Sequence, residues 1–156
     1  MEAMEKKINI LYVDDESNNL VAFKALFRRD YNIHTAVSAE EGVALLKEHP
    51  FHIILTDQRM PGTTGVEFLE SIIPEFPDPI RILITGYADI QAVINAINKG
   101  QVYRYITKPW DEQELKMTIE NAYEIYSLRE SNRQLTAQLL EANKQLDFML
   151  RQKLLS

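Results

Sequence analysis

The chain has 156 residues, of which 46% are hydrophobic and 26% are charged, and this suits one domain with a modest extension. Seventeen basic and 23 acidic residues leave a net charge of −6. Because an acidic surface repels nucleic acids and anionic membranes, we expect neither as a direct partner. There is no cysteine, which excludes disulfides and thiolate metal sites. With no apolar run of membrane-spanning length and no signal peptide, the sequence predicts a cytoplasmic protein.

Five short apolar runs alternate with segments in which apolar residues recur every three or four positions. The runs predict strands, at residues 8–13, 31–37, 51–56, 80–84 and 102–106. The intervening segments predict helices. Strands that alternate with helices of this length indicate an α/β fold, in which a doubly wound, five-stranded parallel sheet carries helices on both faces.

Capping residues mark some of the helix boundaries. Ser38 followed by Glu41 is a capping-box pair, which predicts that a helix starts there. Residues 90–97 form one strongly amphipathic helical stretch, and Gly100 is the expected C-cap of that helix.

Polar side chains follow four of the five predicted strands. Asp14 and Asp15 follow the first strand, Asp57 the third, Thr85 the fourth and Lys108 the fifth. In a doubly wound sheet, the carboxyl ends of the strands meet at one edge and form the ligand site. We therefore expect these five residues to gather there, although they are far apart in the sequence.

These residue types predict a specific chemistry. Carboxylates at neighbouring strand ends repel one another unless a divalent cation neutralises them, and oxygen ligands without His or Cys favour Mg²⁺. Asp57 would then act as a carboxylate nucleophile and form an aspartyl phosphate. Lys108 would supply a positive charge and Thr85 a hydrogen bond to the phosphoryl oxygens. Gly86 would leave room for the phosphoryl group.

Taken alone, most of these residues have an ordinary explanation. A pair of Asp residues often begins a helix, and Tyr105 is compatible with a half-buried strand aromatic. Because these polar residues occur together at the ends of several strands, we favour the functional interpretation. The histidines have no evident carboxylate partner in the sequence, so we interpret them as structural or solvated: His34, His49 and His52.

Over about residues 7–127 the sequence resembles the receiver domain of two-component response regulators. The residues that carry the resemblance are Asp14, Asp15, Asp57, Thr85, Tyr105, Lys108 and Pro109. The resemblance implies a flavodoxin-like domain that accepts a phosphoryl group from a sensor histidine kinase or a phosphotransfer protein. Such a domain is a phosphoacceptor switch, not an enzyme with external substrates.

The resemblance also assigns roles at the cation site. It implies that Asp15, Asp57 and the backbone carbonyl of Arg59 bind Mg²⁺ directly, and that Asp14 acts through a water. The Lys108–Pro109 peptide bond is expected to be cis, which would aim the lysine into the site.

Two further pairs take their roles from the resemblance. Thr85 and Tyr105 are expected to be a coupled switch, in which the tyrosine moves behind the threonine after phosphorylation. Arg59 and Tyr87 lie two residues beyond Asp57 and Thr85, where receivers border the path of the attacking water. Both side chains are large and neither is a good base at neutral pH, so we expect slow self-dephosphorylation.

Two alternatives compete with this interpretation. A phosphatase of the haloacid-dehalogenase type also uses an Asp nucleophile, Mg²⁺, a Thr and a Lys. Such enzymes need an acid two residues after the nucleophile, and here that position is Arg59. The other alternative is a degenerate receiver that serves only as a dimer scaffold, and the complete acidic set argues against it.

The last segment has a different character, because residues 110–156 contain no Gly and no Pro. Asp111 with Glu114 forms a capping pair, and Trp110 with Leu115 has hydrophobic-staple spacing. A helix from Glu112 to about residue 150 would be too long for the sheet to cover. We therefore divide the chain into a receiver domain at 1–127 and a projecting helix at 128–156.

Spacings of three and four residues form a coiled-coil seam along this helix. Its members are Ile125, Leu128, Asn132, Leu135, Leu139, Ala142, Leu146 and Met149. Asn132 occupies an a position, and the pattern favours a parallel homodimer. Few of the flanking positions are charged, so charge pairing across the seam is weak. The alternative is a single amphipathic helix that folds back on the sheet, and the helix length argues against it.

The chain ends while still helical, so we expect an output domain beyond Ser156. Residues 83–110 resemble the receivers attached to cyclic-dinucleotide phosphodiesterases of the HD-GYP type. This is a resemblance of the receiver only, since the sequence contains no output residues.

Overall fold

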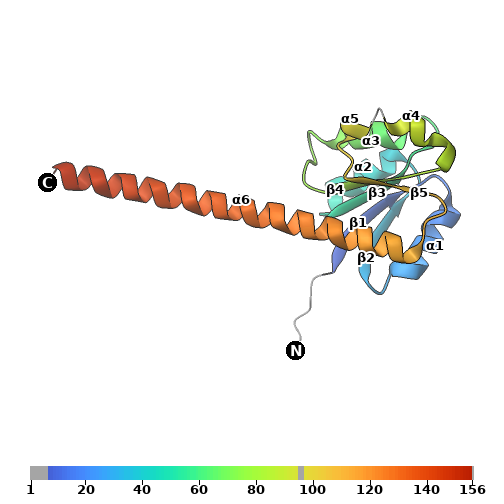
Figure 1. Cartoon of the computed structure of the whole chain (residues 1–156), viewed down its shortest axis with the longest axis horizontal. Helices are drawn as coiled ribbons and strands as arrows, with labels where there is room; N and C mark the ends of the chain where they lie inside the picture. Colours follow the sequence, from blue (N-terminus) through green and yellow to red (C-terminus); the bar gives the residue numbers. More distant parts are fainter. Residues whose placement is uncertain (1–6, 95–96, 156) are drawn as a thin grey trace.

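Five parallel strands form one sheet in the computed structural model, which describes residues 7–94 and 97–155. The strand order is β2-β1-β3-β4-β5. The strands are β1 (Ile8–Val13), β2 (Tyr31–Ala36), β3 (Ile53–Asp57), β4 (Ile80–Thr85) and β5 (Arg104–Thr107). The predicted fold class, a doubly wound five-stranded parallel sheet with a long C-terminal helix, is confirmed (Figure 1).

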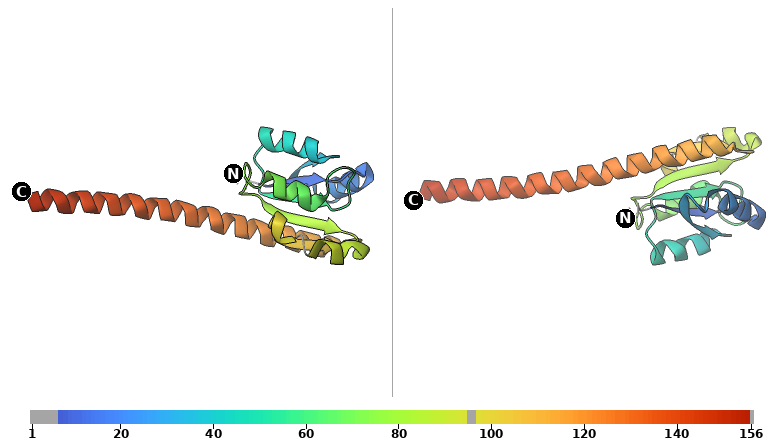
Figure 2. Two further views of the ribbon diagram at one scale, coloured as in Figure 1. Left: turned by 90° about the horizontal axis from the view of Figure 1, so that it is seen from above. Right: turned by 90° about the horizontal axis from the view of Figure 1, so that it is seen from below.

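Helices cover both faces of this sheet, as Figures 1 and 2 show. They are α1 (Ser17–Phe27), α2 (Ala39–Glu48), α3 (Gly65–Ile72), α4 (Ile90–Ile94), α5 (Ile97–Gly100) and α6 (Glu112–Leu155), with a short 3₁₀ turn, η1 (Tyr87–Asp89), before α4. Side chains of α1 and α6 form one core with the sheet, and those of α2, α3 and α4 form the other. The central strands are buried on both faces, which explains their continuous apolar runs.

Two strands begin later than the sequence pattern predicts. β3 begins at Ile53 and β5 at Arg104, each two residues after the start of its apolar run. The preceding Phe51 and Val102 pack into the core on the α2–α3 side of the sheet. They are apolar because of this packing, so the hydrophobic pattern alone extended both strands too far.

Gly100 does not have the C-cap conformation that we predicted. It is the last residue of α5, and the following residue, Gln101, adopts the left-handed conformation with φ 50°. A Cβ at Gly100 would lie 3.3 Å from Leu69 Cβ and 3.4 Å from the Val66 carbonyl oxygen. The glycine therefore lies tightly against α3. Residues 95–96 of the predicted helix lie outside the described residues.

The two predicted N-terminal helix caps are present. The Ser38 hydroxyl accepts a hydrogen bond from the Glu41 backbone N–H at 3.1 Å, and Glu41 in turn accepts one from the Val37 N–H. Asp111 caps α6 by accepting a hydrogen bond from the Glu114 backbone N–H at 3.0 Å.

The first turns of α6 cover the sheet, and the rest of the helix projects from the domain (Figure 1). α6 has 44 residues, so it is about 66 Å long at about 1.5 Å per residue. Its buried side chains end at Ala122, and every residue from 131 to 155 is exposed. Within the described residues, none of the helices combines the length and apolar character needed to cross a bilayer.

The histidines lie among aromatic side chains, with His34 on β2, His49 directly after α2 and His52 directly before β3. The His34 and His49 rings are 4.5 Å apart, and Phe51 packs edge-on against His34. His52 accepts a hydrogen bond from the Asn9 backbone N–H at 2.9 Å and packs against two tyrosines of α6. These contacts agree with the structural interpretation.

Candidate functional site

The carboxyl edge of the sheet gathers the polar residues that the sequence analysis selected. Asp57 is the last residue of β3 and Thr85 the last of β4. Asp14 and Asp15 follow β1, and Lys108 follows β5. The backbone continues to pair past the strand ends, since the Lys108 N–H donates to the Thr85 carbonyl at 2.9 Å. This pairing holds the loops that carry the site close to the sheet.

Three carboxylates converge at the centre of the site. One oxygen each from Asp14, Asp15 and Asp57 lies within 4.8 Å of the others. Asp14 is fully buried and Asp57 is 3% exposed, whereas Asp15 is exposed. Burying like charges this close together is unfavourable unless a cation neutralises them. The three oxygen ligands therefore suit a hard divalent cation such as Mg²⁺.

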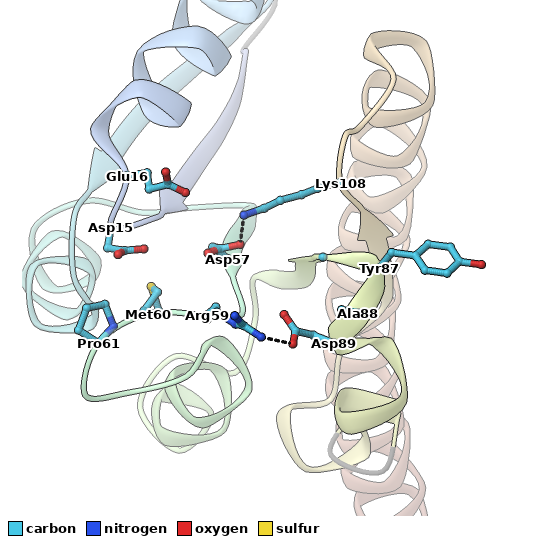
Figure 3. A pocket seen from close by; sticks show the side chains of 11 residues that line it. Asp15, Glu16, Asp57, Arg59, Met60, Pro61, Tyr87, Ala88, Asp89 and Lys108 are labelled. Carbon is cyan, nitrogen blue, oxygen red and sulfur yellow. Dashed lines mark hydrogen bonds and ion pairs between the residues drawn. The ribbon is translucent and has the colours of Figure 1, made fainter.

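Lys108 reaches from the β5–α6 loop to the central carboxylate (Figure 3). Its Nζ lies 2.6 Å from Asp57 Oδ1. Burial raises the pKa of the Asp57 carboxyl above its usual value, and the Lys108 hydrogen bond only partly opposes that rise. Burial also acts to lower the pKa of the Lys108 ammonium, but the hydrogen bond and charge of Asp57 outweigh it, so that pKa is raised. The Lys108–Pro109 peptide bond is cis, as the resemblance implied.

A pocket of about 650 Å³ opens above Asp57. Its lining residues are Asp15, Glu16, Asp57, Arg59, Met60, Pro61, Gly86, Tyr87, Ala88, Asp89 and Lys108. Arg59 Nη2 lies 2.7 Å from Asp89 Oδ1, so this ion pair joins the loop after β3 to η1 beside the pocket (Figure 3). The Tyr87 ring points away from the pocket and is 81% exposed.

The loop after Asp57 depends on a glycine that the sequence analysis did not select. A Cβ at Gly65 would lie 2.4 Å from the Asp57 carbonyl oxygen, which is too close for any side chain. The Gly65 and Val66 N–H groups donate to the backbone and side-chain oxygens of Gln58. A capping box between Thr64 and Glu67 then starts α3. The start of α3 is therefore packed directly against the phosphoacceptor candidate.

The predicted switch residues occupy two different environments. Thr85 is fully buried, and its hydroxyl lies 3.4 Å from the Gly86 carbonyl oxygen. Gly86 lines the pocket, and a Cβ there would approach only Asp89 Oδ2, at 3.7 Å. Tyr105 is 39% exposed and lines a separate surface cavity between α4 and α6. The structure thus places Thr85 beneath the pocket and Tyr105 on the neighbouring face.

Sequence reasoning missed Asp89, Glu16 and Tyr12. Asp89 belongs to η1, whose path brings it to Arg59 across 30 residues of sequence, and no local pattern signals that contact. Glu16 lines the pocket only because α1 begins beside it. Tyr12 looks like one more apolar strand residue, although its hydroxyl lies 3.0 Å from Asp14 Oδ2.

The site geometry agrees with comparisons to known proteins. Residues 10–120 match the family model described as the response regulator receiver domain. The chain is 37% identical over 152 residues to the hydrogenase transcriptional regulatory protein HoxA of Cupriavidus necator, covering 97% of this chain and 32% of that protein. It is 31% identical over 117 residues to the transcriptional regulatory protein ZraR of Salmonella typhimurium, covering 74% of this chain and 26% of that one. The chain thus spans a third or less of these relatives.

A solved structure extends the similarity from sequence to fold. The signal receiver domain of an HD domain-containing protein from Pseudomonas fluorescens Pf-5 superposes with a TM-score of 0.76 at 30% identity, covering 84% of this chain and 97% of that one. The family match spans most of the chain and includes every strand-end residue described above. The chain therefore belongs to the response regulator receiver domain family of two-component systems.

Proposed function

We propose that this chain is a phosphorylation-dependent switch in which Asp57 accepts a phosphoryl group from a phosphohistidine. The donor is a sensor histidine kinase or a phosphotransfer protein. One observation carries the proposal: Asp57 lies at the base of an open pocket, 2.6 Å from the Lys108 ammonium and within a cluster of three carboxylates. A buried carboxylate with a fixed cationic neighbour and open space above it suits nucleophilic attack on a phosphoryl group.

The transfer forms one bond to phosphorus and breaks another. A carboxylate oxygen of Asp57 attacks phosphorus, a new O–P bond forms, and the P–N bond to the donor histidine breaks. The imidazole leaves with the electron pair of that bond. Lys108, which now neutralises Asp57, is placed to interact with the phosphoryl oxygens afterwards. Gly86 leaves room for them because it has no side chain.

Asp14, Asp15 and Asp57, together with the backbone carbonyl of Arg59, are the groups that we propose hold Mg²⁺. The ion supplies positive charge that offsets the charge of the transferring phosphoryl group. Asp15 is exposed and Asp14 is buried, so the cluster combines one accessible oxygen ligand with one fixed at the back of the site. We place the reaction in the cytoplasm, where ATP-dependent kinases phosphorylate such proteins.

Thr85 and Tyr105 are proposed to carry the signal from the site to the surface. The Thr85 hydroxyl makes a long, 3.4 Å contact to the Gly86 carbonyl oxygen, so it is available to turn toward a phosphoryl group. That movement would open space for the half-exposed Tyr105 ring on the adjacent strand. The surface formed by α4, β5 and α6 would then change shape. The chain assists its own phosphorylation and dephosphorylation, and we propose no external substrate for it.

We further propose that the projecting part of α6 forms a parallel homodimer. The seam residues Leu128, Leu135, Leu139, Leu146 and Met149 are between 55% and 64% exposed, although they are large and apolar. A row of such side chains on one side of a free helix is the pattern that a coiled-coil partner covers.

Two of the flanking pairs are compatible with a parallel arrangement. In a parallel dimer a residue at g faces the residue five positions later on the partner helix. This places Glu124 opposite Arg129, and Gln138 opposite Asn143. The first pair has opposite charges and the second can form hydrogen bonds. An output domain after this helix would receive the signal through it.

Mass spectrometry of the intact chain tests the central proposal. With Mg²⁺ and a small donor such as acetyl phosphate, the wild-type chain should gain one phosphoryl group. Asp57→Asn removes the nucleophile at nearly constant size and should abolish the gain, whereas Asp147→Asn on the exposed part of α6 should not. Stable Mg²⁺-dependent phosphorylation of the Asp57→Asn chain would disprove the assignment. Turnover of a generic phosphate ester by the wild-type chain would favour the phosphatase alternative.

A further inference from the structure

The buried carboxylate of Asp14 is held by three neutral hydrogen-bond donors. The Tyr12 hydroxyl and the Asn19 amide both donate to Oδ2, at 3.0 and 3.1 Å, and the Glu16 backbone N–H donates to Oδ1 at 2.9 Å. Donors on both oxygens fix the plane of the carboxylate as well as its position. Asp14 is therefore oriented before any ligand enters the site.

Packing in the core fixes the position of the Tyr12 hydroxyl. Tyr12 and Asp14 are two residues apart at the end of β1, so their side chains lie on the same face of the sheet. The Tyr12 ring is fully buried and packs edge-on against Phe23 of α1, with ring centres 5.0 Å apart. The ring packing and the 3.0 Å contact to Asp14 Oδ2 together fix where the hydroxyl lies.

These donors matter because the lysine of the site pairs with Asp57 and not with Asp14. Lys108 is paired with Asp57, and none of the described cationic side chains forms an ion pair with Asp14. A buried carboxylate is costly unless hydrogen-bond donors satisfy its oxygens. Tyr12 and Asn19 supply that compensation while no divalent cation is present.

The geometry assigns Tyr12 and Asn19 as positioning residues of the divalent-cation site. They fix the position and plane of the Asp14 carboxylate, so that the cation, or its bound water, meets a preorganised oxygen. This inference rests on the proposed cation-dependent phosphorylation of Asp57 and names two residues outside the acidic set. Loss of a hydrogen-bond partner behind a metal-site carboxylate typically lowers metal affinity about 10-fold or more.

Magnesium titration of the full chain tests this assignment. Tyr12→Phe removes only the hydroxyl and keeps the ring that packs on Phe23. Trp110 is the single tryptophan and lines a cleft together with Tyr12, Asn19 and Lys108, so its fluorescence can report Mg²⁺ binding, with calorimetry as a second readout. We expect the Mg²⁺ dissociation constant to rise about 10-fold.

A matched variant separates positioning from general loss of a buried hydroxyl. Tyr31 is also buried, at 3% exposure, and its hydroxyl lies 3.4 Å from Glu120, a carboxylate outside the acidic cluster. Tyr31→Phe should leave the Mg²⁺ affinity unchanged. Asn19→Ala removes the second donor from a partly exposed position and should weaken Mg²⁺ binding even if Tyr12→Phe folds poorly.

Phosphorylation kinetics distinguish positioning from damage to the fold. In Tyr12→Phe, the Mg²⁺ concentration for half-maximal Asp57 phosphorylation should rise, while the rate at saturating Mg²⁺ stays near that of the wild type. Wild-type Mg²⁺ affinity in both Tyr12→Phe and Asn19→Ala would overturn the inference and leave the proposed function intact. A wild-type chain that binds no Mg²⁺ and takes no phosphoryl group would overturn both.

Discussion

The receiver domain and the projecting part of α6 differ in where their apolar side chains lie. In the domain, strand residues such as Ile53, Leu55 and Ile82 are fully buried by helices of the same chain. Along α6, Leu135 and Leu139 are each 62% exposed, and every described residue from 131 to 155 is exposed. The domain therefore completes its own core, whereas the helix presents a surface that a second chain can complete. Folding of the first region should not depend on the second.

The charged residues of the two regions differ in the same way. In the domain, Lys108 and Asp57 form a short ion pair in which the carboxylate is almost fully buried. On α6, Arg151 and Asp147 are paired one turn apart, and both are largely exposed. Exposed helical pairs contribute only about 0.3–0.5 kcal/mol. The buried Lys108–Asp57 pair thus bears on chemistry, whereas the exposed Arg151–Asp147 pair adds little stability to the helix.

Truncation after Ser127 should have the largest effect on this comparison. It removes most of the seam but keeps the α6 residues that pack on the domain core, the last of which is Tyr126. The truncated chain should be a folded monomer that still phosphorylates Asp57, whereas the full chain should be a dimer. Sedimentation velocity of both chains at micromolar concentration measures this. If both are monomers, the coiled-coil proposal is wrong and α6 needs a different partner.

Asn132→Ile should sharpen the comparison from within the seam. In a parallel dimer two Asn side chains at an a layer can bond to each other, whereas an unpaired buried amide would cost about 1–3 kcal/mol. Replacing Asn132 with an apolar residue should raise the thermal unfolding temperature of the dimer while loosening its register or oligomeric state.

Ala137→Ile is the matched control for that substitution, because it adds the same side chain on the outer face of α6. Only Asn132→Ile should change the oligomers seen by light scattering. An unchanged unfolding temperature in Asn132→Ile would show that Asn132 does not lie in a buried layer.

Much of the site could be predicted because strand ends in a parallel sheet meet at one edge. That rule alone brought Asp57 and Lys108 together, and the structure places them in contact. The Arg59–Asp89 pair could not be predicted, because it depends on the path of two loops that are set by tertiary packing. Gly65 was missed for a related reason, since its need for a bare Cα arises only from the approach of the Asp57 backbone.

Thr85→Ala should uncouple phosphorylation of Asp57 in the domain from the response of α6, without preventing phosphorylation. The variant keeps Asp57, Lys108 and the acidic cluster, so phosphorylation should continue. Without the hydroxyl, residue 85 cannot donate a hydrogen bond to the phosphoryl group. The surface formed by α4, β5 and α6, which includes Tyr105, should therefore stay unchanged. Hydrogen exchange over β5 and α6, with and without phosphorylation, measures this. Thr107→Ala on the neighbouring strand is the control. A normal exchange response in Thr85→Ala would argue against the switch pair.

The smallest expected effect concerns whether the domain shields the aspartyl phosphate bond from water. We predict that replacing Arg59 and Tyr87 with alanine speeds loss of the phosphoryl group a few-fold, because water would reach it more easily. In the structure the two residues lie differently, so we expect them to contribute unequally. Arg59 is held beside the pocket by Asp89, whereas the Tyr87 ring points outward (Figure 3). Arg59→Ala alone should therefore reproduce most of the change in the decay of phosphorylated chain, and Tyr87→Ala should have little effect. An unchanged decay rate in the double variant would refute shielding, and the slow step would then lie in positioning the attacking water.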